Sequence, residues 1–280
     1  MIRASCMVLA LVVTVLSAGG CDRSAPSNAP ASAAPTPSMG AAPPAAPSAV
    51  AASAASGTSP IVAEAGTPAL AARFDAEPLG GPSNAFEAVV GDWRVAQAGG
   101  ATGYEVDGAK WRDGVASPSL AEQAKRLYGD RHAEFLDGVK AFAFYPLAIF
   151  NEPPPAGDLR VTVRFYPIAG KIDQGAGIAF GITPSGGYHG VRANALEDNL
   201  LYFTVTRGKR SVIETVRNVA TPTRTWHTLL LELRGRQLVV KVDDVKRLEK
   251  TLDSVPVGRV GLWSKADSHV LFDDFAVTKL

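Results

Sequence analysis

The chain contains few cysteines, no excess of either charge and no cluster of metal-binding residues. Cys6 and Cys21 are its only cysteines, so everything beyond residue 21 lacks both disulfides and cysteine-based zinc sites. The 28 basic and 27 acidic residues balance, and no basic run occurs, which argues against a nucleic-acid partner. The four histidines show no ligand spacing, and no Ser-His-Asp order, phosphate-binding glycine loop or dinucleotide fingerprint is present.

The first twenty residues have the pattern of a secretory signal. A short start, Met1-Ile2-Arg3, precedes an apolar stretch from Met7 to Leu16 and the small residues 17–20. One positive charge, an apolar core and a small-residue run are typical of an export signal. The apolar stretch is too short to span a bilayer, which requires about 20 residues.

Cys21 follows these small residues directly, and this arrangement resembles a bacterial lipobox. In a lipobox the cysteine is lipidated and becomes the mature N-terminus; Ala18 stands here where Leu or Val is usual. We therefore expect residues 1–20 to be a lipoprotein signal peptide and Cys21 the lipidation site. The expected location is a bacterial cell envelope, with the protein membrane-anchored and facing the periplasm, or secreted if Cys21 is not lipidated.

Residues 21–70 are predicted to form a disordered tether. Beyond Asp22 they are almost wholly Ala, Pro, Ser, Gly and Thr, without aromatics. Such a segment cannot bury enough apolar surface to offset the entropy cost of ordering. As a coil, about 50 residues would span on the order of 40 Å. Residues 71–280 remain as one domain with a core of its own.

Within this domain the dominant period is two. In residues 159–165 apolar and charged or polar positions alternate, as a half-buried strand requires. Turn-like residues at 207–210 and 234–236 each separate two alternating runs, which predicts two hairpins. Many short strands separated by turns predict a mostly β fold, a two-sheet antiparallel sandwich or jelly roll.

One segment departs from this period. Ser117 is a good N-cap, Pro118 suits the first helical position, and Leu120, Ala124 and Leu127 recur at helical spacing. A second helical piece is predicted at 131–137. We therefore expect one or two short helices near residues 117–137, which either cap an open end of the sandwich or cover a binding face.

Three stretches, 169–174, 191–199 and 258–268, carry a family resemblance together with 226–229 and 272–275. They resemble exported bacterial proteins of the concanavalin A-like (laminin-G-like) jelly-roll superfamily. Within it they resemble a family of unknown function described as 3-keto-disaccharide hydrolase-like or glucanase-like. The resemblance implies two curved antiparallel sheets. It leaves the activity open, because this superfamily contains hydrolases, lectins and structural modules.

The catalytic patterns of these relatives are absent. Retaining glucanases of this fold carry Glu-x-Asp-x-Glu or Glu-x-Asp-x-x-Glu on one strand face, and no such pattern occurs here. Residues 74–77 also depart from the Phe-Asn-Gly-Lys-type motif of the 3-keto relatives. Three acidic doublets come closest, at 197–198, 243–244 and 273–274. Neighbouring residues of a strand point to opposite faces, so we expect none to be a catalytic pair. The second should be a solvated turn, and the third should cap a loop.

The most function-like residues are polar and concentrated in the resembling stretches. The predicted ligand-binding set is Asp173, Gln174, Arg192, Asn194, Glu197, Asn199, Trp263, Lys265 and Asp267. Arg and Asn two residues apart share one strand face and can donate to sugar hydroxyls, while a tryptophan offers a stacking surface. The alternative is a structural network in which residues 197–199 form a turn and the basic side chains pair with carboxylates.

Together these observations predict a lipid-anchored envelope protein whose jelly roll binds a glycan or another envelope component without hydrolysis. Two alternatives remain open. One is a glycoside-cleaving enzyme of the 3-keto type, with Glu197 or Asp198 as base and Arg192 or Lys265 holding the substrate; the other is a purely structural module. No cofactor is expected. Calcium stays open, because Asp173, Asp198, Asn199 and Asp267 offer the oxygen ligands that it prefers.

Overall fold

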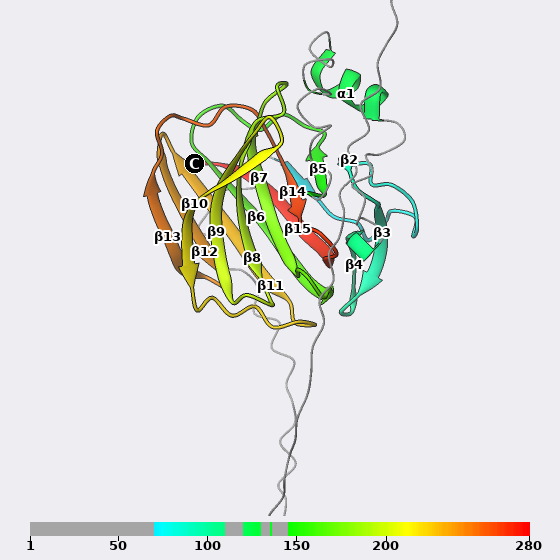
Figure 1. Cartoon of the computed structure of the whole chain (residues 1–280). Helices are drawn as coiled ribbons and strands as arrows, with labels where there is room; N and C mark the ends of the chain where they lie inside the picture. The colour runs from blue at the N-terminus through cyan, green and yellow to red at the C-terminus, as the bar shows by residue number, and fades with distance from the viewer. Residues whose placement is uncertain (1–69, 110–119, 130–134, 136–144) are drawn as a thin grey trace, which may run out of the picture. The chain divides into compact units, whose positions relative to one another are not determined.

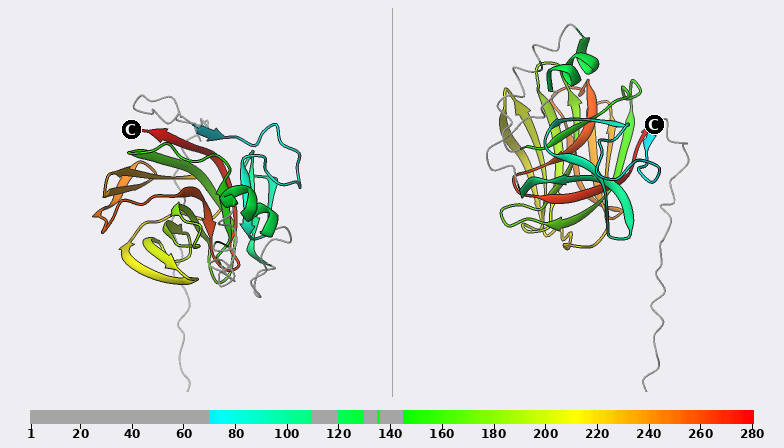
Figure 2. Two further views of the ribbon diagram at one scale, coloured as in Figure 1. Left: turned by 90° about the horizontal axis from the view of Figure 1, so that it is seen from above. Right: turned by 90° about the vertical axis from the view of Figure 1, so that its right-hand side faces the viewer.

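The structure is a computed structural model that describes residues 70–109, 120–129, 135 and 145–280. These residues form two antiparallel sheets packed face to face, with one short helix (Figures 1 and 2). The eight-stranded sheet has the order β13 (Val245–Thr251), β12 (Gln237–Val242), β11 (His227–Arg234), β6 (Leu159–Ala169), β15 (His269–Lys279), β4 (Ala101–Asp107) and β3 (Trp93–Ala98), with β1 (Leu70–Ala72) also on β15.

The seven-stranded sheet has the order β10 (Lys209–Arg217), β9 (Asn199–Thr206), β8 (Tyr188–Asn194), β7 (Gly175–Ile182), β14 (Arg259–Ser264), β5 (Leu147–Phe150) and β2 (Phe86–Val90). Seen from above, both sheets curve in the same sense as two stacked layers (Figure 2). The predicted mostly β, two-sheet sandwich is confirmed. Both predicted hairpins are present as β9–β10 and β11–β12, and the alternating run 159–165 lies in β6.

The main core lies between the two sheets. Strand alternation directs Ile178 and Phe180 of β7 toward Phe165 of β6 and Leu231 of β11, and all four are fully buried. The intervening residues of β6 are only partly buried, because that side of the eight-stranded sheet faces solvent. This arrangement explains why the alternation was so clear in the sequence of β6.

The seven-stranded sheet is buried on its outer face as well. Trp263, Phe203 and Tyr188 lie there and form a second apolar cluster with Ala124 of helix α1 (Leu120–Tyr128) and with Phe135. Because both of their faces are covered, the strands β7 and β9 have nearly continuous apolar sequences.

The predicted helix is present as α1, and polar contacts hold it beside edge strand β2. Arg126 lies 2.5 Å from Glu87 of β2, and Arg259 of β14 donates to the carbonyl oxygen of Leu127 at 3.1 Å. The predicted N-cap Ser117, and the second helical piece at 131–137 apart from Phe135, lie outside the described residues. No helix in the described part of the chain is long and apolar enough to cross a membrane.

Candidate functional site

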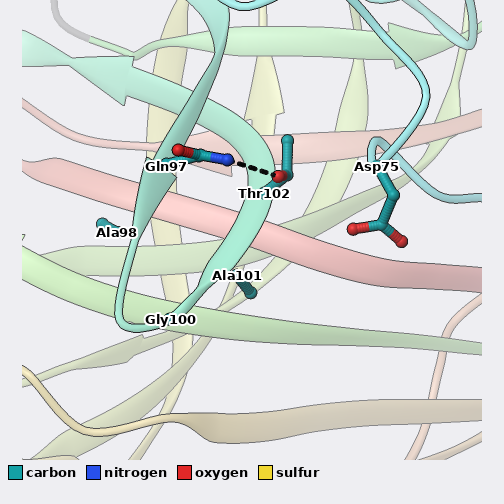
Figure 3. A pocket seen from close by; sticks show the side chains of 6 residues that line it. All are labelled: Asp75, Gln97, Ala98, Gly100, Ala101 and Thr102. Carbon is teal, nitrogen blue, oxygen red and sulfur yellow. Dashed lines mark hydrogen bonds between the residues drawn. The ribbon is translucent and has the colours of Figure 1, made fainter.

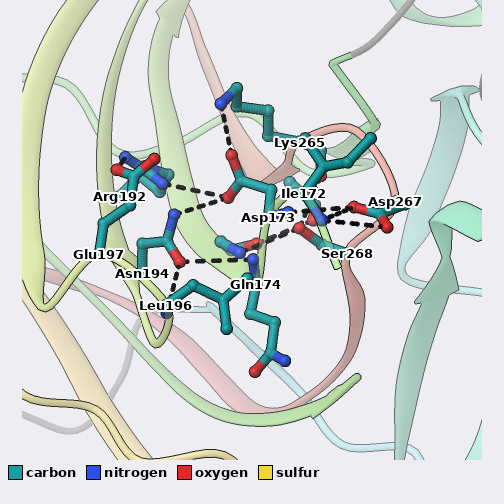
Figure 4. A network of polar contacts seen from close by, with 12 residues as sticks. Ile172, Asp173, Gln174, Arg192, Asn194, Leu196, Glu197, Lys265, Asp267 and Ser268 are labelled. Carbon is teal, nitrogen blue, oxygen red and sulfur yellow. Dashed lines mark hydrogen bonds and ion pairs between the residues drawn. The ribbon is translucent and has the colours of Figure 1, made fainter. Parts of the chain in front are cut away.

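Four neighbouring strands of the seven-stranded sheet begin or finish at the same end of the sheet, and this brings most of the predicted residues together. Strands β7 and β9 begin there while β8 and β14 end there, because neighbouring strands are antiparallel. The connections 170–174, 195–198 and 265–268 therefore lie side by side (Figure 4). Three sequence stretches, the first and last of which are more than ninety residues apart, converge only through this pairing.

Asp173 is the centre of the polar network. Its Oδ1 accepts hydrogen bonds from Arg192 Nη1 at 3.1 Å and Asn194 Nδ2 at 2.8 Å, and its Oδ2 accepts one from Lys265 Nζ (Figure 4). Asp173 and Asn194 are fully buried, and Arg192 is 1% exposed. A carboxylate in such a place is tolerated only when cations and donors satisfy it, and here both of its oxygens are used.

Arg192 connects this buried centre to the surface. Its Nη2 donates to Glu197 Oε2 at 2.8 Å and to Asn199 Oδ1 at 3.3 Å, and Asn199 Nδ2 donates to the same Glu197 oxygen at 2.9 Å. The Glu197 side chain is 40% exposed. Burial raises its pKa, but the hydrogen bonds from Arg192 and Asn199 outweigh burial and hold that pKa below its ordinary value. Glu197 is therefore ionised and fixed in orientation.

Backbone contacts fix the adjoining loop. The Asp267 carboxylate accepts hydrogen bonds from the N–H groups of Lys171, Ile172 and Asp173 at 2.8 to 3.2 Å. Burial raises the pKa of Asp267, yet these three donors together bring it below its ordinary value. Three N–H groups that no strand partner reaches are thus satisfied by one side chain.

Side-chain amides complete this arrangement. Asn194 Oδ1 accepts from the N–H of Gln174 at 3.3 Å and of Leu196 at 2.9 Å. The Gln174 side chain donates to the carbonyl oxygen of Gly170 at 3.1 Å and accepts from Thr223 Oγ1 at 2.5 Å. Asn194 and Gln174 therefore hold the loop backbone, and neither reaches far into solvent.

The structure separates the predicted set into three groups. Asp173, Gln174, Arg192 and Asn194 are buried, while Asn199 and Asp267 are partly buried and hold Glu197 and the 171–173 backbone. Glu197 and Lys265 reach the surface, the latter with 23% of its side chain exposed. The third group is Trp263, which is fully buried on the outer face of the sheet and donates to the Tyr188 hydroxyl at 2.9 Å.

Two further expectations concern Asp198 and a possible calcium site. Asp198 lies in the exposed β8–β9 turn with a positive φ of 46°, as expected for residues 197–199 in the structural alternative. For calcium, the oxygens of Asp173 and Asp267 are occupied by N–H and ammonium donors. Among the residues that the structure describes, no three His, Cys, Asp or Glu side chains are grouped closely enough to hold a metal ion.

The doublet 243–244 forms the expected turn, between β12 and β13, with both residues at positive φ. Its first carboxylate is not simply solvated. Asp243 accepts from the N–H of Thr228 at 2.8 Å and lies 2.8 Å from His227 Nδ1. Burial raises the pKa of Asp243, but hydrogen bonds from His227 and Thr228 bring it below its ordinary value. Asp243 thus ties the turn to β11.

For the third doublet, the expectation of opposite faces is wrong. The register of β15 shifts between Asp273 and Ala276, and Asp274 has a φ of 49°, so a β-bulge interrupts the alternation. Phe272 and Phe275 both enter the core, which leaves Asp273 and Asp274 together on the outer face of the eight-stranded sheet. The sequence does contain a signal of this bulge. Two polar residues stand between the core aromatics Phe272 and Phe275, whereas strict alternation places a single outward residue between two inward ones.

This carboxylate pair lies beside positive charge and beside a third acidic residue. Asp274 Oδ2 is 3.1 Å from Arg164 Nη1. Asp273 is only 8% exposed, and burial, followed by the charges of Asp274 and Asp75, raises its pKa. Asp75 also lines a hollow of about 410 Å³ next to the β3–β4 hairpin, where Gln97 donates to Thr102 at 3.2 Å (Figure 3).

With this geometry established, comparison with known proteins identifies the fold and nothing finer. No family model and no curated protein matches the chain. Among solved structures, it resembles the carbohydrate-binding module CBM66 from Bacillus subtilis, with 15% identity and a TM-score of 0.50 over 70% of this chain and 98% of that one.

Two further structures show weaker likeness. One is a Bacillus subtilis protein of unknown function with a galectin-like fold, at 16% identity and a TM-score of 0.40 over 48% of this chain and 77% of that one. The other is the β-glucanase of Bacillus licheniformis, at 12% identity and a TM-score of 0.36 over 48% and 71% of the two chains. The expected architecture, a two-sheet antiparallel jelly-roll-like sandwich, is confirmed.

The first prediction concerns the buried network. Asp173→Asn should lower the free energy of unfolding by about 3–5 kcal/mol, because Arg192 would lose its buried counter-charge. Glu197→Gln, on the exposed arm of the same network, should cost less than about 1 kcal/mol. Urea denaturation of both variants measures the difference. Equal losses would contradict the central role of Asp173.

The second prediction concerns the pH dependence of stability. A carboxyl whose folded-state pKa is raised contributes stability below its unfolded pKa of about 3.9 and loses that contribution as pH rises through the folded pKa. Asp273→Asn should therefore raise Tm at pH 7, by about 2 °C, and the gain should vanish below about pH 4. Asp267→Asn is the matched control: because the pKa of Asp267 is lowered, this variant should lose stability at pH 7 and recover parity in acid. Thermal melts from pH 3 to 8 decide both.

Proposed function

We propose that this protein is a lipid-anchored module of a bacterial cell envelope that binds a glycan through the surface formed by Glu197 and Lys265. The observation that carries the proposal is an ionised surface carboxylate and a partly exposed ammonium held in place by a buried network. Side chains fixed before binding lose little conformational entropy when a ligand arrives. Hydroxyl groups of a sugar suit both partners, since they donate to carboxylates and accept from ammonium groups.

The surroundings of these two groups support a sugar as ligand. Ile172 and Leu196, in the adjoining loops, are 64% and 46% exposed. Exposed apolar side chains beside fixed polar groups fit a ligand that has both C–H surfaces and hydroxyls. The fold is the one found in the carbohydrate-binding module CBM66, although a likeness at 15% identity supports the architecture and not the ligand.

The chemistry of Glu197 favours binding over cleavage. A glycosidase requires a proton-donating carboxylic acid with a raised pKa next to a second carboxylate. The pKa of Glu197 is lowered, and the other carboxylate that contacts Arg192, Asp173, has both of its oxygens hydrogen bonded. We therefore propose that the module holds its glycan without hydrolysing it. Glycoside cleavage of the 3-keto type remains the rival function.

The envelope location rests on the N-terminal sequence. Cys21 follows an export signal and precedes a low-complexity segment of about 50 residues. A coil of that length would let a membrane-anchored domain reach ligands on the order of 40 Å from the bilayer. Lipid anchoring and a reach of this size fit a module that recognises another component of the envelope.

The third prediction tests glycan binding. The full chain should bind a subset of an array of bacterial and plant glycans, and Glu197→Gln should weaken that binding at least tenfold, which corresponds to about 1.4 kcal/mol. Glu249→Gln on exposed strand β13 is the matched control and should bind as the native chain does. A silent array, or undiminished binding by Glu197→Gln, would refute the proposed site. Release of reducing sugar from a bound glycan would favour the hydrolase.

The fourth prediction tests the anchor. When the chain is expressed in a bacterium supplied with a clickable palmitate analogue, it should be labelled and recovered with the membranes. Cys21→Ser should abolish the label, because the acyl groups would have no thiol to receive them. Cys6→Ser should keep it, since Cys6 lies in the segment expected to be removed. Persistent labelling of Cys21→Ser would rule out the anchor.

A further inference from the structure

A second hollow lies at the open side of the sandwich, where an edge region of each sheet contributes to its walls. It has a volume of about 340 Å³, which falls in the range of small-molecule sites. The seven-stranded sheet contributes His189, Tyr202 and Thr204 to its lining, and β13 and the segment after it contribute Lys250, Asp253 and Ser254. None of these residues belongs to the Asp173 network.

Two polar rings in this hollow are held rigidly. His189 Nδ1 and the Tyr202 hydroxyl are 2.8 Å apart, and the two rings lie nearly parallel at 5° with centroids 6.0 Å apart. The imidazole also stacks on Phe180 at 5.3 Å. Both rings project from the inner face of the sheet, since Phe180 and Tyr202 belong to the main core. The donors and acceptors of the hollow are therefore set before any ligand enters.

Both rings are uncharged at neutral pH. Burial lowers the pKa of His189, and this outweighs the opposite influence of Asp253. Burial, with a smaller contribution from Asp253, raises the pKa of Tyr202 to about 12. A neutral imidazole has one donor and one acceptor nitrogen, and a phenol can both donate and accept. This combination suits hydroxyl groups, which also donate and accept.

The rest of the lining is balanced in charge and rich in hydroxyls. Lys250 is paired with Glu214 at 3.1 Å, and Asp253 provides one acidic group. Thr204 and Ser254 add hydroxyls, while Ile213, 45% exposed, provides an apolar surface at the edge strand β10. Because Lys250 is already paired and Asp253 is a single carboxylate, the hollow offers no cluster of charge to an anion or to a cation. A neutral ligand with several hydroxyls and a C–H face fits this lining.

We propose that this hollow is a second carbohydrate subsite, which takes a single neutral sugar residue such as the end of a glycan chain. This inference rests on the proposed glycan-binding function and adds a second place for the ligand. His189 is the second residue of β8, and Asn194 is its last. Roughly 17 Å of strand therefore separates the subsite from the Asp173 network. The two sites also use opposite faces of the sheet, because Arg192 lies between the inward residues Val191 and Ala193. Each can therefore be tested without disturbing the other.

The experiment follows the imidazole resonances of the full chain by NMR while D-glucose, D-galactose, D-mannose and D-fructose are each added to 100 mM. The chain has only four histidines, and His189→Gln identifies the signal of interest. We expect at least one sugar to shift the His189 signal with a saturable, millimolar response, while the His269 signal stays unchanged. A shift that is absent for all four sugars, or that rises linearly without saturation, would overturn the proposal.

Substitutions make the test specific. Thr204→Val keeps the shape of the side chain and removes a hydroxyl from the hollow, so the sugar concentration for half-saturation should rise at least fivefold. Thr162→Val, on the outer face of β6, is the matched control and should change nothing; melting curves of both variants verify that they fold. Equal responses of the two variants would refute the subsite.

The outcome also separates this inference from the function on which it rests. If the glycan array is positive and depends on Glu197 while His189 stays silent, the subsite fails and the proposed function stands. If His189 responds to a sugar and depends on Thr204 while Glu197→Gln has no effect on array binding, the subsite holds and the proposed Glu197 site fails.

Discussion

The contact on which the site depends is the buried ion pair between Asp173 and Arg192. It joins the loop before β7 to the end of β8, and Lys265 joins the β14–β15 turn to the same carboxylate. Removing one of these charges leaves the remaining buried charges less well compensated, so these three side chains are energetically linked. The side chains of the site that contact solvent, chiefly Glu197 and Lys265, are held in position by this buried pair.

The seven-stranded sheet is covered on both faces except at its exposed edge strand β10. Its outer face carries Trp263 and Phe203 under Ala124 of α1 and Phe135, so the tryptophan that the sequence suggested for stacking is part of a core. The surfaces left for recognition lie at the ends and edges of the sheet. This explains why the Glu197 site is built from loop residues and strand termini, and why the hollow beside His189 lies where edge regions of the two sheets meet.

The pKa values of three carboxylates are shifted in different directions because of their surroundings, and not because of their residue type. Glu197 and Asp267 receive hydrogen bonds that favour the ionised form, whereas Asp273 is buried next to other negative charges and favours the proton. The bulge at Asp274 creates this last environment. A single residue at positive φ thus turned a doublet that should have been divided between two faces into a pair on one face.

The sequence by itself determined the class of fold, because period-two alternation, as in 159–165, follows directly from burying one face of a strand. It also indicated the two hairpins, the short helix and the stretches that converge at the network. It could not determine that Trp263 would be buried, since this depends on α1 and Phe135 packing on the outer face, a contact between distant segments. Nor could it locate the hollow beside His189, which exists only where the edges of two sheets come together. Local patterns decide what each strand is, and only tertiary packing decides which side chains are left for a ligand.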